Sequence, residues 1–423
     1  MVIARPLKQT LFVSFLALAL VAGLPGCGGA AGGRGKTASP APQEPAQKPA
    51  VVYDHAITDT ARVLAGLPPE DAQRFAAVVE RPAWKAHQAE FDTNWSQIEQ
   101  QRFKVMREWR DKQFKATADG CGTLYYPFAG PDFLNAYLLF PTCQHYLLFG
   151  LESVGSVPAI EKLKPEQVDK AFAQLREALS DIFKRDYFIT RTMETELHAS
   201  QVDGTLPLIL TMLARVDARV VSIDTDGPWN PPADAAPAEP APEPASADAP
   251  AKGTKPAGKP VAKPRSNKLP AVTVSFVAKG SDQIQKVTYI RVDMINAEYS
   301  KRTQLLAYLK GIGPVTTFVK SASYLMHDDR FSMVRDMVLD QSSALLQDDT
   351  GVPFRLIDKA KWTLTFYGKY SPPISDFKYG FQKDLDAVFK QPGVARELPF
   401  TFGYHWREGT SSVILAVRKD QSR

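Results

Sequence analysis

The feature that most constrains the fold is a proline-rich segment in the middle of the chain. Residues 227–268 contain 11 of the 33 prolines, together with many alanines and few large apolar side chains. A segment of this composition buries too little apolar surface to fold, so we expect a disordered, semi-extended linker. Its acidic residues precede its basic ones. The basic part could contact an anionic surface, although a solvated spacer is the simpler interpretation.

The linker separates two stretches of globular composition, which we expect to form domains at residues 51–226 and 269–423. Hydrophobic residues make up 44% of the chain and charged residues 23%, which argues against wholesale disorder and against a multi-pass membrane protein. One alternative stays open. Residues 219–223 and 271–278 could be neighbouring strands of one sheet, and the linker would then be a long loop inside a single domain.

Residues 1–26 have the features of a secretory signal. Arg5 and Lys8 precede an apolar run over residues 11–22, which is short for a membrane span of about 20 residues. The sequence Leu24-Pro25-Gly26-Cys27 then resembles the lipobox of bacterial lipoproteins. An ordinary signal peptide followed by a chance cysteine is the alternative.

The lipobox resemblance implies that Cys27 is the first residue of the mature protein and carries the lipid. Residues 27–50 are rich in Gly, Ala and Pro, and we expect a disordered tether. Gly28 stands where an Asp would resemble an inner-membrane retention signal. We therefore expect a lipid-anchored protein of the cell envelope, in the outer membrane and facing the periplasm or the cell surface.

The other two cysteines, Cys121 and Cys143, are predicted to form a disulfide, because pairs of cysteines in an oxidising compartment are usually bridged. Two buried thiols are the alternative. Two thiols make a poor ligand set for zinc, and we expect neither a metal nor another cofactor. Without residues 1–26 the net charge falls from +5 to +3. No basic stripe is present, so we expect no nucleic-acid partner.

Hydrophobic periodicity predicts an α+β fold, with a helix-rich N-terminal half and a mostly antiparallel sheet with helices in the C-terminal half. In the first half we expect helices at 91–116, 165–183 and 206–216, and strands at 145–151 and 219–223. In the second half we expect strands at 271–278, 287–293, 362–366, 400–407 and 413–417, and helices at 299–310, 329–346 and 379–390.

Residues 125–134 form the most distinctive segment of the sequence. Gly130-Pro131-Asp132 is typical of a turn into a helix, which would put Asp132 at the positive helix end. Tyr125, Tyr126 and Asp132 are therefore candidate ligand contacts, with the rings as stacking surfaces. A structural turn with aromatic core packing explains the same residues and is the commoner case.

Residues 400–407 alternate between aromatic and polar side chains. As a strand they would put His405 and Arg407 on one face, about 7 Å apart. This pair could bind an anion or place a general acid beside a stabilising charge. With a carboxylate such as Asp132 it forms our candidate catalytic set. A solvent-exposed polar strand face is the alternative.

His327 and Asp349 are further candidate ligand contacts. His327-Asp328-Asp329 precedes a predicted helix, and Asp348-Asp349-Thr350-Gly351 follows it. Together these residues could hold a hard metal ion. Helix capping and turn formation explain all of them without a metal. The sequence has no standard nucleophile, zinc-protease or phosphate-loop motif.

Four segments together resemble a family of bacterial secreted or lipid-anchored proteins of unknown function: residues 126–133, 147–152, 321–327 and 403–407. The resemblance implies no activity or fold, only that these segments belong together. The long tethers give reach, so we expect a binding or scaffold module for a glycan, cell-wall or protein partner in preference to an enzyme. The alternative is a periplasmic hydrolase or transferase built around His405, Arg407 and a carboxylate.

Overall fold

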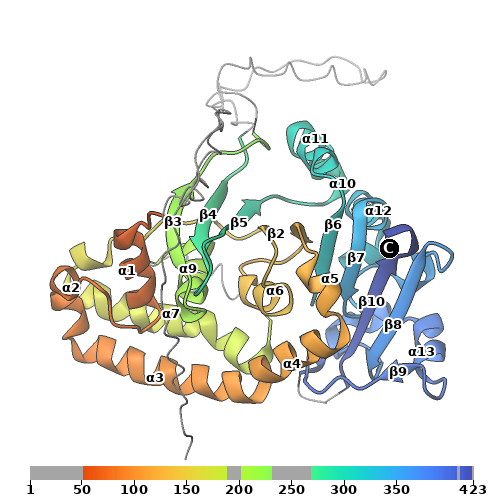
Figure 1. The fold of residues 1–423 in the computed structure, drawn as a ribbon, viewed down its shortest axis with the longest axis horizontal. Coiled ribbons are helices and arrows are strands. Elements are labelled where there is room, and N and C mark those ends of the chain that lie inside the picture. The colour runs from red at the N-terminus through yellow and green to blue at the C-terminus, as the bar shows by residue number, and fades with distance from the viewer. Residues whose placement is uncertain (1–50, 188–201, 231–267, 407–409, 422–423) are drawn as a thin grey trace, which may run out of the picture. The chain divides into compact units, whose positions relative to one another are not determined.

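The computed structural model describes residues 51–187, 202–230, 268–406 and 410–421 (Figure 1). The signal segment, Cys27, the tether, most of the linker and Arg407 lie outside the described residues. No helix among the described residues is long and apolar enough to cross a membrane.

The central element is a sheet with ten described strands, in the order β3-β4-β5-β2-β1-β6-β7-β10-β8-β9. Five neighbouring strands at its centre are all parallel. They are, in spatial order, β5 (Ile284–Arg291), β2 (His145–Gly150), β1 (Thr123–Tyr126), β6 (Val315–Val319) and β7 (Ser342–Gln347).

Antiparallel strands flank this parallel centre. On one side, β4 (Ala271–Val277) pairs with β5 and with β3 (Arg219–Asp224). On the other side, β10 (Ser412–Arg418) lies between β7 and β8 (Trp362–Gly368), and β9 (Ala395–Arg396) pairs with β8. The α+β class is confirmed, but the sheet is mixed and not mostly antiparallel.

Strands from both sides of the linker belong to this one sheet, and the described residues from 51 onward form one compact unit. β3, which precedes the linker, pairs directly with β4, which follows it. This pairing is the arrangement that the sequence left open as a long loop within a single domain.

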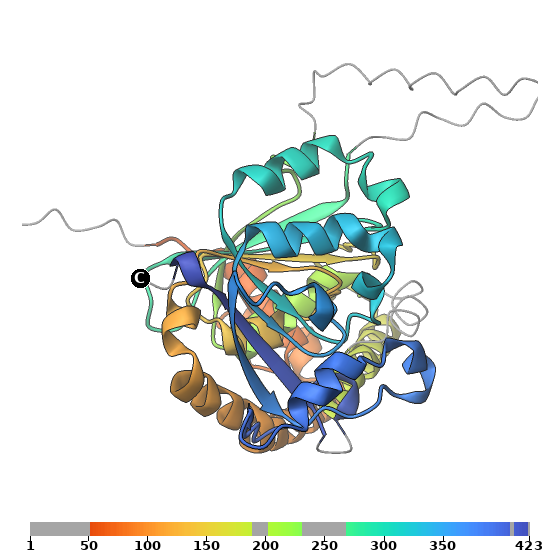
Figure 2. The ribbon, with the colours of Figure 1, turned by 90° about the vertical axis from the view of Figure 1, so that its right-hand side faces the viewer.

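Helices cover both faces of the sheet, as Figure 2 shows. Side chains of one strand alternate between two hydrophobic cores: Leu124 and Tyr126 pack in one core, Tyr125 in the other. The first core contains α1 (His55–Leu64), α2 (Ala72–Val79), α3 (Pro82–Ile98), α4 (Lys104–Gln113), α5 (Lys115–Asp119), α6 (Phe133–Leu139), α7 (Pro165–Arg185) and α9 (Thr205–Arg215). The second contains α10 (Asn296–Tyr299), α11 (Thr303–Gly311) and α12 (Ser332–Gln341).

The predicted helices at 165–183 and 206–216 correspond closely to α7 and α9. The helix predicted at 91–116 begins earlier, at Pro82, because proline suits a first helical turn. It is also interrupted by a π-helical turn at Glu99–Phe103. The helix predicted at 379–390 is shorter, as α13 (Lys383–Phe389).

Two predicted elements are wrong. The helix at 329–346 ends at Gln341, and residues 342–347 form β7. Short apolar segments buried on both faces do not show which of the two structures they adopt. Residues 400–407 form no strand in their described part. Their side chains pack through a turn of 3₁₀-helix at Gly403–His405.

Cys121 and Cys143 lie at disulfide-bond distance, with their sulfur atoms 1.95 Å apart. The two residues come just before β1 and β2, so the bridge ties the starts of these neighbouring parallel strands together.

Candidate functional site

A pocket of about 470 Å³ opens at the carboxyl ends of the central parallel strands. Along the chain the central strands run β1, β2, β5, β6, β7, but in space β6 lies on the opposite side of β1 from β2. From β1 the chain therefore passes first to β2 and β5 on one side, and later crosses to β6 and β7 on the other side. In open α/β sheets such a switch point leaves a crevice outside the carboxyl ends, and ligands bind there.

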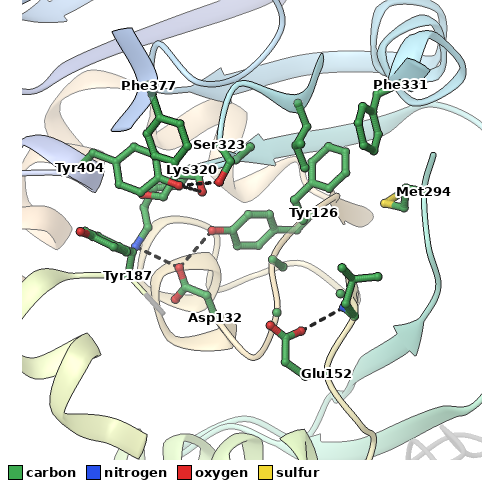
Figure 3. A pocket seen from close by; sticks show the side chains of 18 of the residues that line it. Tyr126, Asp132, Glu152, Tyr187, Met294, Lys320, Ser323, Phe331, Phe377 and Tyr404 are labelled. Atoms are coloured by element: carbon green, nitrogen blue, oxygen red, sulfur yellow. Dashed lines mark hydrogen bonds and ion pairs between the residues drawn. The ribbon is translucent and has the colours of Figure 1, made fainter. Parts of the chain in front are cut away.

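Loops after four of the parallel strands line the pocket (Figure 3). The loop after β1 contributes Phe128, Gly130 and Asp132, and the loop after β2 contributes Leu151 and Glu152. The loops after β5 and β6 contribute Val292, Asp293, Met294, Lys320, Ser321, Ala322 and Ser323.

Aromatic rings make up much of the remaining wall. The rings of Phe128 and Phe331 meet edge to face, with centroids 5.8 Å apart. The ring of Tyr404 lies 4.9 Å from that of Tyr187 and 5.0 Å from that of Phe377. Largely apolar walls with a few polar groups are typical of small-molecule sites.

A buried ion network joins two residues of the pocket lining, Asp132 and Lys320, to residues outside it. Nζ of Lys320 lies 3.0 Å from Oδ2 of Asp132 and 3.5 Å from Oδ2 of Asp186. Lys320 also donates to the main-chain carbonyl of Asp186. Nη2 of Arg102 lies 3.3 Å from Oδ1 of Asp186. Two cations thus face two carboxylates, and the ammonium of Lys320 is committed to this network.

Asp132 has two roles in the network. It is the N-cap of α6, where its Oδ1 accepts a hydrogen bond from the backbone N–H of Asn135 at 3.3 Å. Its Oδ2 accepts from the hydroxyl of Tyr126 at 3.0 Å. Burial and the charge of Asp132 raise the pKa of Tyr126. A dinucleotide-binding sheet places a phosphate at the helix after its first strand, and here a carboxylate occupies that position.

The loop after β6 has an unusual backbone. Ser321, Ser323 and Tyr324 have φ values of 53°, 50° and 55°, in the left-handed region that non-glycine residues rarely adopt. Clusters of such residues are found where surrounding structure holds a functional loop in place.

The loop after β7 holds this strained segment. The N–H of Ser321 donates to Oδ2 of Asp348 at 2.8 Å, and the N–H of Ala322 donates to Oγ1 of Thr350 at 2.7 Å. The hydroxyl of Tyr324 donates to Oδ2 of Asp349 at 2.5 Å. Burial, together with the neighbouring Asp349 charge, raises the pKa of Asp348 to about 7, and burial raises that of Asp349 to about 6.

Of the predicted ligand contacts, Tyr126 and Asp132 line the pocket. Tyr125 points to the opposite face of the sheet and packs against Phe149. Asp349 is not part of the pocket lining; its carboxylate accepts the hydrogen bond from Tyr324 of the strained loop. His327 lines a separate hollow with Tyr324 and Arg355, and burial lowers its pKa to about 4.

The predicted catalytic set is not brought together in the described residues. His405 does not line the pocket that contains Asp132. It is buried in the 3₁₀ turn, where Nδ1 lies 3.3 Å from Oγ of Ser371. Arg407 lies outside the described residues. The described part of this segment, residues 400–406, does not form the strand that was expected to place the two side chains on one face.

Glu152, Lys320 and the strained loop were not among the predicted site residues, although the resemblance included segments 147–152 and 321–327. The available signal was a charged residue close after a buried strand: Lys320 directly follows β6, and Glu152 is the second residue after β2. Among the described residues, no group of three or more His, Cys, Asp or Glu side chains is placed to hold a metal ion.

No family model matches the chain. Comparison with curated proteins and with solved structures likewise gives no match.

Proposed function

We propose that this chain is a lipid-anchored protein of the cell envelope that binds a small organic group in the pocket at the carboxyl ends of β1, β2, β5 and β6. The group is either a free small molecule or the terminal part of a glycan, cell-wall or protein partner. The anchor is the lipid on Cys27, and the location is the outer membrane, on the periplasmic or surface side.

One observation carries the binding proposal: the pocket lies at the switch point of the parallel strands and is built by four of their loops. Ligand positions in open α/β sheets follow from this topology. The aromatic pairs Phe128–Phe331 and Tyr187–Tyr404 supply apolar contact area, and the pocket volume suits a ligand of about drug size.

Binding is favoured over catalysis by the state of the charged groups. The ammonium of Lys320 is held by Asp132 and Asp186, and Asp132 is further held by Tyr126 and Asn135. These groups are satisfied by one another, whereas a nucleophile or general base needs access to the reacting atoms. The alternative of a hydrolase or transferase gains no support from His405, which is absent from the pocket lining.

The test is a thermal-shift screen of neutral, cationic and anionic small molecules against the full chain in non-ionic detergent. Compounds that raise the melting temperature are then titrated by calorimetry. Leu325 lines the pocket, and Leu325→Trp should fill it and weaken binding at least tenfold.

The matched control is Leu356→Trp. Leu325 and Leu356 both lie in 3₁₀ turns, at Leu325–His327 and Phe354–Leu356, but Leu356 is exposed and lies outside the pocket lining. This variant should bind as the wild type does. Equal binding by Leu325→Trp, or no compound that stabilises the wild type, would contradict the proposal.

A further inference from the structure

We propose that the ligand of this pocket carries a protonated amine on an apolar or aromatic body, and that Glu152 receives the amine. This inference rests on the proposed function, since it names the chemical class that the same pocket takes.

The first argument is the charge of the pocket lining. Four carboxylates line the pocket: Asp132, Glu152, Asp293 and Asp376. The one basic residue in the lining, Lys320, is paired with Asp132. Among the described residues, the other three carboxylates have no basic nitrogen within 4.0 Å. The described lining therefore carries an uncompensated negative charge.

The second argument is the position of Glu152. Its side chain comes from the loop after β2 and is only 4% exposed. Oε2 accepts from the N–H of Leu151 at 3.1 Å. The hydroxyl of Tyr289 shares its one proton between Oε2, at 3.1 Å, and the main-chain carbonyl of Glu152, at 2.9 Å. Within the described residues Oε1 has no hydrogen-bond partner, although it borders the pocket (Figure 3). A buried carboxylate without a cation is costly, so a ligand cation that donates to Oε1 would relieve this cost.

Neighbouring residues do not supply that cation. Arg291 is exposed, and its Nε donates to the carbonyl of Leu151 at 2.8 Å. Two glycines make room for the carboxylate. A Cβ at Gly150 would lie 2.4 Å from Oε2, and one at Gly130 would lie 3.3 Å from Oε1. The backbone around Glu152 is thus shaped to accept its carboxylate at this place.

The third argument is the wall chemistry. Ring faces attract cations electrostatically, and they also pack against apolar bodies. The pairs Phe128–Phe331 and Tyr187–Tyr404 provide these faces. Asp293 and Asp376 are exposed at the rim and would attract a cation toward the pocket. These carboxylates would repel an anionic ligand, and the described lining offers it no cation that is not already paired.

The experiment uses three probes of matched size against the full chain: 2-phenylethylamine, 2-phenylethanol and phenylacetate, titrated by calorimetry at pH 7.5. The amine is a cation, the alcohol a neutral donor and the acetate an anion. We expect the amine to bind at least tenfold more tightly than the alcohol, and phenylacetate to bind most weakly.

Glu152→Gln keeps the size and the acceptor for Tyr289 but removes the charge. This variant should bind the amine at least tenfold more weakly than the wild type does, and its affinity for the alcohol should change less than twofold. Glu161→Gln is the matched control, since Glu161 pairs with Arg74 outside the pocket lining, and it should leave all three probes unchanged. A melting curve for each variant checks folding.

Equal binding of the amine and the alcohol would overturn the ammonium proposal while leaving pocket binding intact. Tighter binding of the amine that survives Glu152→Gln would overturn the role of Glu152. Failure of all three probes would also overturn this inference. The compound screen with Leu325→Trp then decides separately whether the pocket binds at all.

Discussion

Nζ of Lys320 lies 3.0 Å from Oδ2 of Asp132, and both residues are almost fully buried, at 2% and 3% exposure. Lys320 directly follows β6, and Asp132 begins α6 after β1. The pair therefore joins the two loops that flank the switch point of the sheet. Because the carboxylate of Asp186 at the end of α7 also faces Lys320, the same contact fixes a third element of the pocket wall.

Replacing Lys320 by Met should destabilise the protein by about 3–5 kcal/mol, because it leaves the buried carboxylates of Asp132 and Asp186 short of one cation. Urea unfolding measures the change. The double variant Lys320→Met, Asp132→Asn should be more stable than Lys320→Met alone. Exposed Lys301, which pairs with Glu298, is the control, and Lys301→Met should cost less than about 0.5 kcal/mol. Equal effects of the two lysine changes would contradict a structural role for the network.

Asp349→Asn should change the pH dependence of stability. Folding raises the pKa of Asp348 to about 7 and of Asp349 to about 6, above the ordinary value near 4. The folded state thus holds these protons more tightly than the unfolded state. The stabilisation is present at low pH and is lost as pH rises through about 6 to 7.

The variant removes the pH-dependent contribution of Asp349 to stability. It also removes the Asp349 charge, which is one cause of the raised pKa of Asp348. The amide oxygen of the new side chain can still accept the hydrogen bond from Tyr324. We expect the stability of Asp349→Asn relative to wild type to rise between pH 5 and pH 8, by on the order of 1–3 kcal/mol. The comparison with wild type cancels the contribution of the histidines, which both proteins share. Buried His87 and the partly buried His145 and His327 have pKa values lowered to about 4, and they change stability with pH in the opposite direction. For the control Asp340→Asn, at an exposed position, the curve of stability against pH should run parallel to that of wild type. A parallel curve for Asp349→Asn would refute the raised pKa values.

The sequence predicted the helices with clear periodicity, and it predicted β2 and β5, but it missed β1 and β6, the other two strands whose loops line the pocket. β6 reads Val-Thr-Thr-Phe-Val and is buried at every position, because helices cover both faces of the parallel centre. Such strands show no alternation. Alternation did reveal β4 and β10, which lie outside that centre, and β5, which lies at its edge and pairs with β4. The parallel topology, and hence the switch point, could not be derived from local patterns.

Local patterns predicted only those parts of the candidate site that depend on neighbouring residues in the sequence. Asp132 stood out through its own local motif, Gly130-Pro131-Asp132, and its helix-capping role was expected. Its partner Lys320 lies 188 positions further along the chain, and only the adjacency of β1 and β6 brings the two together. Conversely, the alternation at 400–407 looked like a strand, because aromatic side chains that pack through a 3₁₀ turn produce a similar pattern.

Cys27→Ser should release the protein from the membrane if Cys27 carries the lipid. Several acyl chains anchor a protein stably, and without them no helix in the described residues could cross a bilayer. Fractionation of cells expressing the two forms measures the change: wild type in the outer-membrane fraction, Cys27→Ser in a soluble fraction. Ser14→Ala, within the apolar run, is the control and should stay in the membrane. Retention of Cys27→Ser in the outer membrane would contradict the lipoprotein proposal.

Gly150→Ala tests whether the backbone around Glu152 is shaped for its carboxylate. A Cβ at residue 150 would lie 2.4 Å from Oε2 of Glu152 and 2.8 Å from the hydroxyl of Tyr289. Both groups must move, so we expect a loss of about 1–3 kcal/mol in unfolding free energy, the range for overpacking in a well-packed interior.

The control for this change is Gly122→Ala, because a Cβ at Gly122 meets nothing within 4 Å. Gly122 directly precedes β1 and is exposed, so this variant should stay within about 0.5 kcal/mol of wild type. Displacing Glu152 should also weaken 2-phenylethylamine more than 2-phenylethanol, since only the amine depends on the carboxylate charge. A Gly150→Ala protein with wild-type stability and wild-type amine binding would show that the carboxylate has room to shift without consequence. The tight packing around Glu152 would then carry no argument for a ligand.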